Sequence, residues 1–206
     1  MSRPQLVLDI GGVLAANLTP RFWRLAAVEA AVAEQALYRA YKEEMSDRLW
    51  TGAISEERFW AWMRSYAPAL TDEKARGFID DSLEPLPALG RLREWSAAAD
   101  LHVLSNHLRS WVEPVIGPYA DVWTSVTISS EVGCRKPHPE IFARVTPHLP
   151  PGSAVLFVDD QDKNLRQAAL LGWRTLRADE EGAWIEQVLP MLREDRQRPA
   201  SKEEGT

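Results

Sequence analysis

Four short stretches of the chain carry side chains that can act together on a charged substrate. In the first, "QLVLDIGG", Asp9 follows an apolar run and precedes two glycines. The other three hold a hydroxyl and amide pair, an ammonium group and an acidic pair: "LHVLSNH" with Ser105-Asn106, "GCRKPHPEIF" with Lys136, and "AVLFVDD" with Asp159-Asp160. A pocket that combined these groups would hold both negative and positive charge.

These residue types suit chemistry on a phosphate group. A carboxylate such as that of Asp9 can attack phosphorus and form an acyl phosphate, once the repulsion between the two anions is neutralised. Lys136 and a divalent cation would supply that positive charge, and Mg²⁺ prefers oxygen ligands such as Asp9 and Asp160. Ser105 and Asn106 would hold the remaining phosphoryl oxygens, because positioning and charge carry most of phosphoryl transfer.

Alternating strands and helices are needed to bring the four stretches together. Short apolar runs predict strands at 5–8, 101–105, 122–128, 154–158 and 173–177, and helical patterns predict helices at 86–98, 108–116, 139–148, 164–172 and 181–192. This alternation indicates βαβ units and an α/β fold with a parallel sheet covered on both faces. Because ligands of such sheets bind outside the carboxyl ends of the strands, we expect the four stretches to share one pocket.

The segment 17–84 has a different pattern, with apolar and aromatic residues at helical spacing and no strand alternation. We predict that it is an all-helical insertion between the first strand and the rest of the sheet, so that 1–16 and 85–194 form the core. Trp50, Trp60 and Trp62 lie in this insertion, and helical spacing favours packing over stacking on a substrate. The tail 195–206 is almost free of apolar residues and is predicted to be disordered.

Composition limits the remaining possibilities. The chain of 206 residues has a formal net charge of -6 and a sequence pI near 5.3, which argues against a binder of duplex nucleic acid. No run approaches the length of a membrane span or a signal peptide. Cys134 is the only cysteine, which fits a reducing compartment. We therefore predict a cytoplasmic protein, monomeric or homodimeric, with a small-molecule partner and neither nucleic acid nor membrane.

Taken in this order, the four stretches resemble the motifs of the haloacid dehalogenase (HAD) superfamily. The resemblance covers the core and implies a Rossmann-like parallel sheet, and the helical segment sits where that superfamily places its type-C1 cap. The "LSN" cluster, the stretch around Lys136 and "LFVDDQDKNLRQAALLGW" are most similar to the subgroup that contains α-glucose-1-phosphatases and the phosphatase domain of soluble epoxide hydrolases.

The resemblance implies roles for the first three stretches. Asp9 would be the nucleophile and also a metal ligand. Lys136 would carry the charge that bridges the nucleophile and the phosphate. Ser105 and Asn106 would contact the phosphate, and Gly12 would let the backbone pass close to it.

The resemblance also implies Mg²⁺ as the cofactor. In the fourth stretch, the spacing from Lys136 favours Asp160 as the direct metal ligand and Asp159 as its neighbour. Asn164 would support that loop from the following helix. The backbone carbonyl of Gly11 would be a further ligand.

Gly11 is where the sequence departs from the superfamily pattern. Most phosphatases of this superfamily carry a second aspartate there, whose side chain protonates the leaving group. Loss of general-acid catalysis costs roughly a hundredfold or more in rate. The departure favours leaving groups that need little protonation, such as anomeric or acyl phosphates, or protonation by another residue. His107 and His138 are candidates through their positions in the sequence.

Three functions stay open. The leading one is a Mg²⁺-dependent phosphatase that hydrolyses a small phosphorylated metabolite, with sugar phosphates favoured, through an aspartyl phosphate. The second is a 2-haloacid dehalogenase, which would attack carbon without a metal. The acidic pair Asp159-Asp160 argues against it, because two adjacent carboxylates suit a cation. The third is a non-catalytic protein that binds a phosphometabolite or another protein. Gly11 supports this reading, whereas the presence of Asp9 and Lys136 argues against it.

Overall fold

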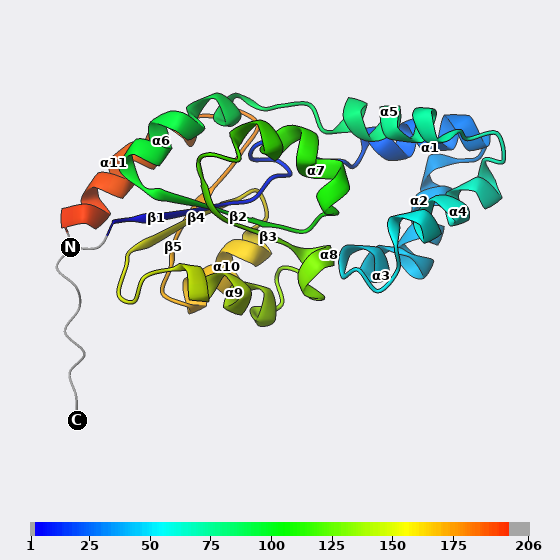
Figure 1. Ribbon diagram of the computed structural model, residues 1–206. Helices are drawn as coiled ribbons and strands as arrows, with labels where there is room; N and C mark the ends of the chain where they lie inside the picture. The colour runs from blue at the N-terminus through cyan, green and yellow to red at the C-terminus, as the bar shows by residue number, and fades with distance from the viewer. Residues whose placement is uncertain (1–2, 198–206) are drawn as a thin grey trace.

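The core of the protein is a parallel β-sheet with its strands in the order β3-β2-β1-β4-β5 (Figure 1). The structure is a computed structural model in which residues 3–197 are described. The strands are β1 (Gln5–Leu8), β2 (Asp100–Ser105), β3 (Trp123–Ile128), β4 (Val155–Asp159) and β5 (Arg174–Arg177). All four pairings are parallel. The predicted α/β fold is confirmed, and each predicted strand lies within about a residue of its observed position.

Helices cover both faces of this sheet, with α6, α7 and α11 on one face and α9 and α10 on the other (Figure 1). The helices of the core are α6 (Leu92–Ala98), α7 (Arg109–Ile116), α8 (Ser129–Val132), α9 (Pro139–Val145), α10 (Asp162–Leu170) and α11 (Ile185–Gln197). Short 3₁₀ turns lie at Pro87–Arg91, Gly117–Tyr119 and Thr146–His148. None of the helices in residues 3–197 has both the length and the apolar character needed to cross a membrane.

Side-chain alternation along the central strand connects it to two separate cores. Leu6 and Leu8 of β1 pack into the larger apolar cluster, which also holds Trp95 of α6. Val7 points to the opposite face and packs into a second cluster with Phe142 of α9. Successive strand residues face opposite sides of a sheet, so a strand that is buried on both sides reads as one continuous apolar run.

Several helix boundaries differ from the sequence prediction. The segment predicted as a helix at 86–98 begins as a 3₁₀ turn and is α-helical from Leu92, and the helix predicted at 164–172 is observed at Asp162–Leu170. The helix predicted at 139–148 is α-helical only to Val145 and then tightens into a 3₁₀ turn, where Pro147 removes a backbone donor. The last helix begins later than predicted and runs to Gln197. Asp195 is buried and pairs with Arg174 at 2.7 Å. The predicted disorder therefore begins too early, and its remainder, 198–206, lies outside the described residues.

An all-helical insertion follows β1, as the sequence predicted. Its helices are α1 (Arg21–Ala30), α2 (Glu34–Glu44), α3 (Ser46–Trp50), α4 (Glu56–Tyr66) and α5 (Asp72–Ser82). The chain enters and leaves it side by side, because the Ala16 amide donates to the Glu84 carbonyl at 2.8 Å and the Leu86 amide to the Leu14 carbonyl at 2.9 Å. The insertion has its own aromatic packing, in which Trp60 and Trp62 are buried.

The insertion also contacts the core far from its two linkers, where α3 lies beside α8 (Figure 1). Trp50 packs edge-on against His107, with ring centroids 5.3 Å apart. Glu56 accepts a hydrogen bond of 2.7 Å from the indole of Trp111 on α7. These contacts hold the part of the insertion that lies away from its linkers against the carboxyl edge of the sheet.

Gly52 is the tightest point of this contact and provides its test. Its φ is +69°, and a Cβ there would lie 2.0 Å from the Ser130 carbonyl oxygen. We expect Gly52→Ala to lower the free energy of unfolding by more than about 1 kcal/mol. The alanine would have to adopt a left-handed φ, and its Cβ would clash with the Ser130 carbonyl oxygen. The matched control is Gly77→Ala in α5, where an added Cβ meets nothing within 4 Å and a helical alanine stabilises by about 0.5–1 kcal/mol. Urea unfolding measures both, and equal stabilities for the two variants would contradict the packing described.

His102 links three strands on one face of the sheet. Its Nδ1 lies 2.7 Å from the Ser125 hydroxyl of β3, and its Nε2 lies 2.9 Å from Oε1 of Gln5 on β1. Burial is the main cause that lowers the pKa of His102 to about 4. The histidine is therefore neutral in the folded protein under conditions that protonate it in the unfolded chain.

This pKa predicts a specific loss of stability in acid. The unfolded chain binds a proton near pH 6.5 and the folded protein only near pH 4, so stability is complete above pH 6.5 and falls as the pH drops toward 4. The difference amounts to about 3 kcal/mol. We expect His102→Gln to flatten this part of the stability curve, measured by urea unfolding between pH 4 and 7.5. Parallel curves for the variant and the wild-type protein would contradict the assignment.

Candidate functional site

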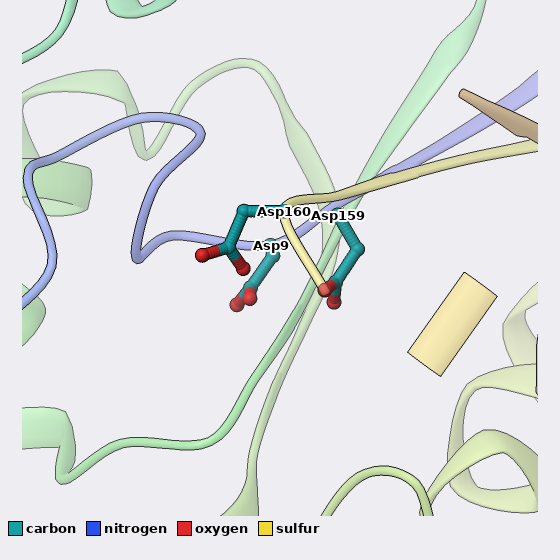
Figure 2. A group of neighbouring side chains, drawn as sticks. All are labelled: Asp9, Asp159 and Asp160. Atoms are coloured by element: carbon teal, nitrogen blue, oxygen red, sulfur yellow. The ribbon is translucent and has the colours of Figure 1, made fainter. Parts of the chain in front are cut away.

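Three carboxylates meet at the carboxyl ends of β1 and β4 (Figure 2). Asp9 follows β1, Asp159 ends β4, and Asp160 is the next residue along the chain. One oxygen of each lies within 4.8 Å of the others. β1 and β4 are adjacent and parallel, which is why residues some 150 positions apart in the chain come together.

Lys136 lies between two of these carboxylates. Its Nζ is 2.8 Å from Oδ2 of Asp9 and 2.6 Å from Oδ2 of Asp159. Lys136 is completely buried, and burial by itself lowers its pKa. The negative charges of Asp159 and then Asp9 outweigh that effect, so the pKa of Lys136 is raised and the ammonium group stays charged. This burial excludes a solvated surface lysine at position 136.

Asp9 is held in an environment that resists its ionisation. Burial is the main cause that raises the pKa of Asp9 to about 7, and the charge of Asp159 adds to it. Lys136 and, to a smaller extent, the Ser105 hydroxyl act in the opposite direction. Oδ1 of Asp9 accepts a hydrogen bond of 2.7 Å from the Ile10 amide. A bound cation would favour the ionised carboxylate.

Asn106 fixes the loop that carries Lys136. Its Oδ1 accepts from the Lys136 amide at 2.7 Å, and its Nδ2 donates to the Lys136 carbonyl at 2.9 Å. The carboxamide therefore acts on the lysine backbone in this arrangement. Ser105, at the end of β2, is buried beside Asp9.

The two adjacent aspartates differ in what occupies their oxygens. Besides the contact with Lys136, Asp159 accepts from the Gln161 amide at 2.8 Å and from Asn164 at 2.9 and 3.0 Å. Asn164 thus supports this loop, as the resemblance implied. Oδ1 of Asp160 is buried without a hydrogen-bond partner among the described residues. Neither aspartate caps α10, whose N-cap residue is Gln161.

Gly12 is required where the backbone turns beside Asp160. Its φ is +71°, and a Cβ on it would lie 2.7 Å from Oδ2 of Asp160. The sequence did not single out Asn17, whose Nδ2 donates to that same Oδ2 at 2.9 Å. Nothing in a lone asparagine at the start of a helical segment points to this contact, because it depends on how the chain folds back toward β4.

The two histidines that the sequence suggested as proton donors lie in different environments. His138 is exposed, and its Nδ1 lies 3.9 Å from Glu140. His107 is buried, and its Nδ1 has no hydrogen-bond partner among residues 3–197. Burial lowers the pKa of His107 to about 3. A histidine that is neutral near pH 7 does not hold the proton that a general acid must deliver.

The charges of the cluster suit a divalent cation. Three carboxylates and one ammonium group leave a net charge of minus two when all are ionised. The unpartnered oxygen of Asp160 fits the same interpretation, because a buried carboxylate oxygen without a donor is costly unless a cation binds it. An oxygen-only donor set of this kind matches the preferences of Mg²⁺.

Comparison with solved structures defines the fold class. A scan of protein-family models and a search of curated proteins both found no match. A HAD family enzyme from Bacteroides thetaiotaomicron matches with a TM-score of 0.78 and 22% identity, over 91% of this chain and 98% of that one. Its complex with magnesium and inorganic phosphate matches with a TM-score of 0.73 and 23% identity, over 88% and 98%.

Two further solved structures match this chain over most of its length. A predicted HAD-like family hydrolase from Porphyromonas gingivalis has a TM-score of 0.72 and 24% identity, over 94% of this chain and 99% of that one. An L-2-haloacid dehalogenase has a TM-score of 0.59 and 19% identity, over 85% and 84%. The chain therefore has the HAD fold.

Lys136 gives a direct test of the site's charge balance. We expect Lys136→Met to lower the free energy of unfolding by about 3–5 kcal/mol at pH 7.5, because it leaves two buried carboxylates without their counterion. The control Lys163→Met removes an exposed lysine and should change little. Adding Asp9→Asn to Lys136→Met should restore part of the loss. Urea unfolding of the four proteins checks this, and a Lys136→Met variant as stable as its control would contradict the pairing.

Proposed function

We propose that this protein is a Mg²⁺-dependent HAD hydrolase that releases phosphate from small phosphate esters, with Asp9 as the nucleophile. The observation that carries the proposal is the contact of Lys136 with both Asp9 and Asp159 inside a cluster of three carboxylates. This arrangement places a fixed positive charge next to a carboxylate at the edge of the sheet where ligands bind.

The reaction follows from the chemistry of these groups. A carboxylate oxygen of Asp9 attacks phosphorus, the bond from phosphorus to the leaving oxygen breaks, and that oxygen departs with the electron pair. Water then attacks the phosphorus of the aspartyl phosphate, which frees inorganic phosphate and regenerates Asp9. The Lys136 ammonium group reduces the repulsion between Asp9 and the phosphate.

Four groups would hold the Mg²⁺ ion: the carboxylates of Asp9 and Asp160, the backbone carbonyl of Gly11, and Asp159 at the edge of the cluster. The Oδ1 of Asp160, which has no hydrogen-bond partner among the described residues, supports a direct role for this aspartate. Asp159 is already engaged with Lys136 and Asn164, which favours a supporting role. When bound, Mg²⁺ supplies positive charge that favours ionised Asp9 and balances the phosphate.

The phosphate would be held by Ser105, Asn106 and the backbone around Gly12. Ser105 lies beside Asp9, and the close approach that Gly12 permits supports a backbone contact. For Asn106 the bonds to Lys136 support an indirect contribution through the lysine loop.

Sugar phosphates are the favoured substrates. The resemblance of the motifs to the glucose-1-phosphatase subgroup supports this choice. A cavity of about 900 Å³ reaches the edge of the carboxylate cluster at Gly12 and Asp160, whereas Asp9, Lys136 and Ser105 are not among its lining residues. This volume lies within the range of ordinary small-molecule sites. The magnesium and phosphate complex of the Bacteroides thetaiotaomicron enzyme supports the same cofactor and ligand class.

The proposal predicts that Asp9→Asn abolishes turnover. We expect wild-type protein with Mg²⁺ to release phosphate from at least one of glucose 1-phosphate, acetyl phosphate and p-nitrophenyl phosphate. Asp9→Asn should lose at least about a thousandfold in rate, because it removes the nucleophile. Asp121→Asn, which changes a surface aspartate paired with Arg93, is the matched control and should keep full activity.

Two outcomes would contradict this function. Chloride release from 2-chloropropionate that persists in a chelator would support a dehalogenase instead. Mg²⁺-dependent phosphate binding without turnover would support a non-catalytic protein.

A further inference from the structure

Asn17 fills the space beside Gly11. A Cβ built on Gly11 would lie 2.9 Å from Oδ1 of Asn17, and Asn17 supplies every atom within 4 Å of that point in residues 3–197, chain neighbours aside. Gly11 does not have the left-handed φ that Gly12 has, so its backbone accepts a side chain. The space for a side chain at position 11 is therefore closed by one carboxamide.

The same carboxamide orients Asp160. Nδ2 of Asn17 donates to Oδ2 of Asp160 at 2.9 Å, while Oδ1 of Asp160 is buried and unpartnered among the described residues. One oxygen of Asp160 is thus occupied and the other is left available. A side chain at position 11 would push the carboxamide away and break this hydrogen bond.

Asn17 also lines the 900 Å³ cavity together with Gly12 and Asp160. An amide nitrogen has two donors, and in residues 3–197 the Asn17 amide makes the one hydrogen bond to Asp160. Its second N–H makes no hydrogen bond within residues 3–197. Among the charged residues that line this cavity, acidic ones outnumber basic ones: Asp81, Glu84, Asp160, Asp179, Glu180 and Glu181 against Arg21 and Arg177. Such a wall disfavours a substrate with a second anionic group.

We propose that Asn17 takes the place of the missing side chain at position 11 and acts as a positioning residue. It orients Asp160 and offers the leaving group a hydrogen bond but no proton. This inference rests on the proposed phosphatase function. The electron pair of the broken phosphorus–oxygen bond then stays on the leaving oxygen, which takes its proton from water.

This arrangement selects a substrate class. Without a general acid, the rate depends on how well the leaving oxygen carries negative charge. Phosphates on weakly basic oxygens are favoured, namely acyl phosphates and anomeric sugar phosphates that have no second anionic group.

A double-mutant cycle on Mg²⁺ affinity tests the positioning role. Asn17→Ala and Gly11→Ala should each weaken Mg²⁺ binding by about three- to tenfold, the range expected for one lost hydrogen bond. The double variant should bind no more weakly than either single variant, because both changes break the same bond. Isothermal titration calorimetry on the full chain measures this, and additive losses would overturn the inference.

A series of aryl phosphates with leaving phenols of graded pKa tests the catalytic consequence. We expect kcat/KM of the wild-type protein to fall steeply as the phenol pKa rises. Gly11→Asp combined with Asn17→Gly should give a shallower dependence, whereas Gly11→Asp alone should stay steep because Asn17 blocks its side chain. A flat dependence in the wild-type protein would mean that another residue donates a proton, and would overturn the inference.

A measurement without metal separates this inference from the proposed function. The side-chain amide NMR signals of Asn17, identified by their loss in Asn17→Ala, should shift in Gly11→Ala and stay unchanged in the control Gly77→Ala. Unmoved signals in Gly11→Ala would overturn the placement of Asn17 whatever the activity. Shifted signals in a protein without turnover would confirm the placement and refute the phosphatase function.

Discussion

The ammonium group of Lys136 has no access to water, and it stays charged because Asp9 and Asp159 lie 2.8 and 2.6 Å away. Burying three charged groups carries a large desolvation cost, which only close pairing and further hydrogen bonds offset. Asn164 and the Gln161 amide donate such bonds to Asp159, the Ile10 amide donates one to Asp9, and Asn106 holds the backbone of Lys136. The positions of these residues are therefore coupled to one another.

The glycines complete this arrangement by leaving room. Gly12 allows Asp160 to approach the turn after β1, and Gly11 leaves space that Asn17 occupies. Because neither glycine has a side chain, the carboxylate of Asp160 and the carboxamide of Asn17 can lie against the turn after β1. The site is defined as much by these close approaches as by its charged groups.

The sequence predicted the sheet and the grouping of the four stretches well, because apolar periodicity is local and parallel strands align their carboxyl ends. It also indicated that Asn164 supports the acidic loop. It did not reveal Asn17, the burial of His107, or the contact of Gly52 with Ser130. Each of these depends on where the helical insertion folds back onto the core, which no local pattern encodes. The end of α11 was missed for a similar reason, because Asp195 is held by Arg174 from a distant strand.

The paired linkers of the insertion have a consequence for how the protein can vary. Since the chain leaves the core at Ala16 and returns hydrogen-bonded to the same point at Glu84, the strand register does not depend on what lies between them. The helical part can vary in length between these two points while the carboxyl ends of β1 and β4 keep their spacing, provided that its contacts with α7 and α8 are kept. Under the proposed function, such changes would alter which compound is admitted without rebuilding the carboxylate cluster.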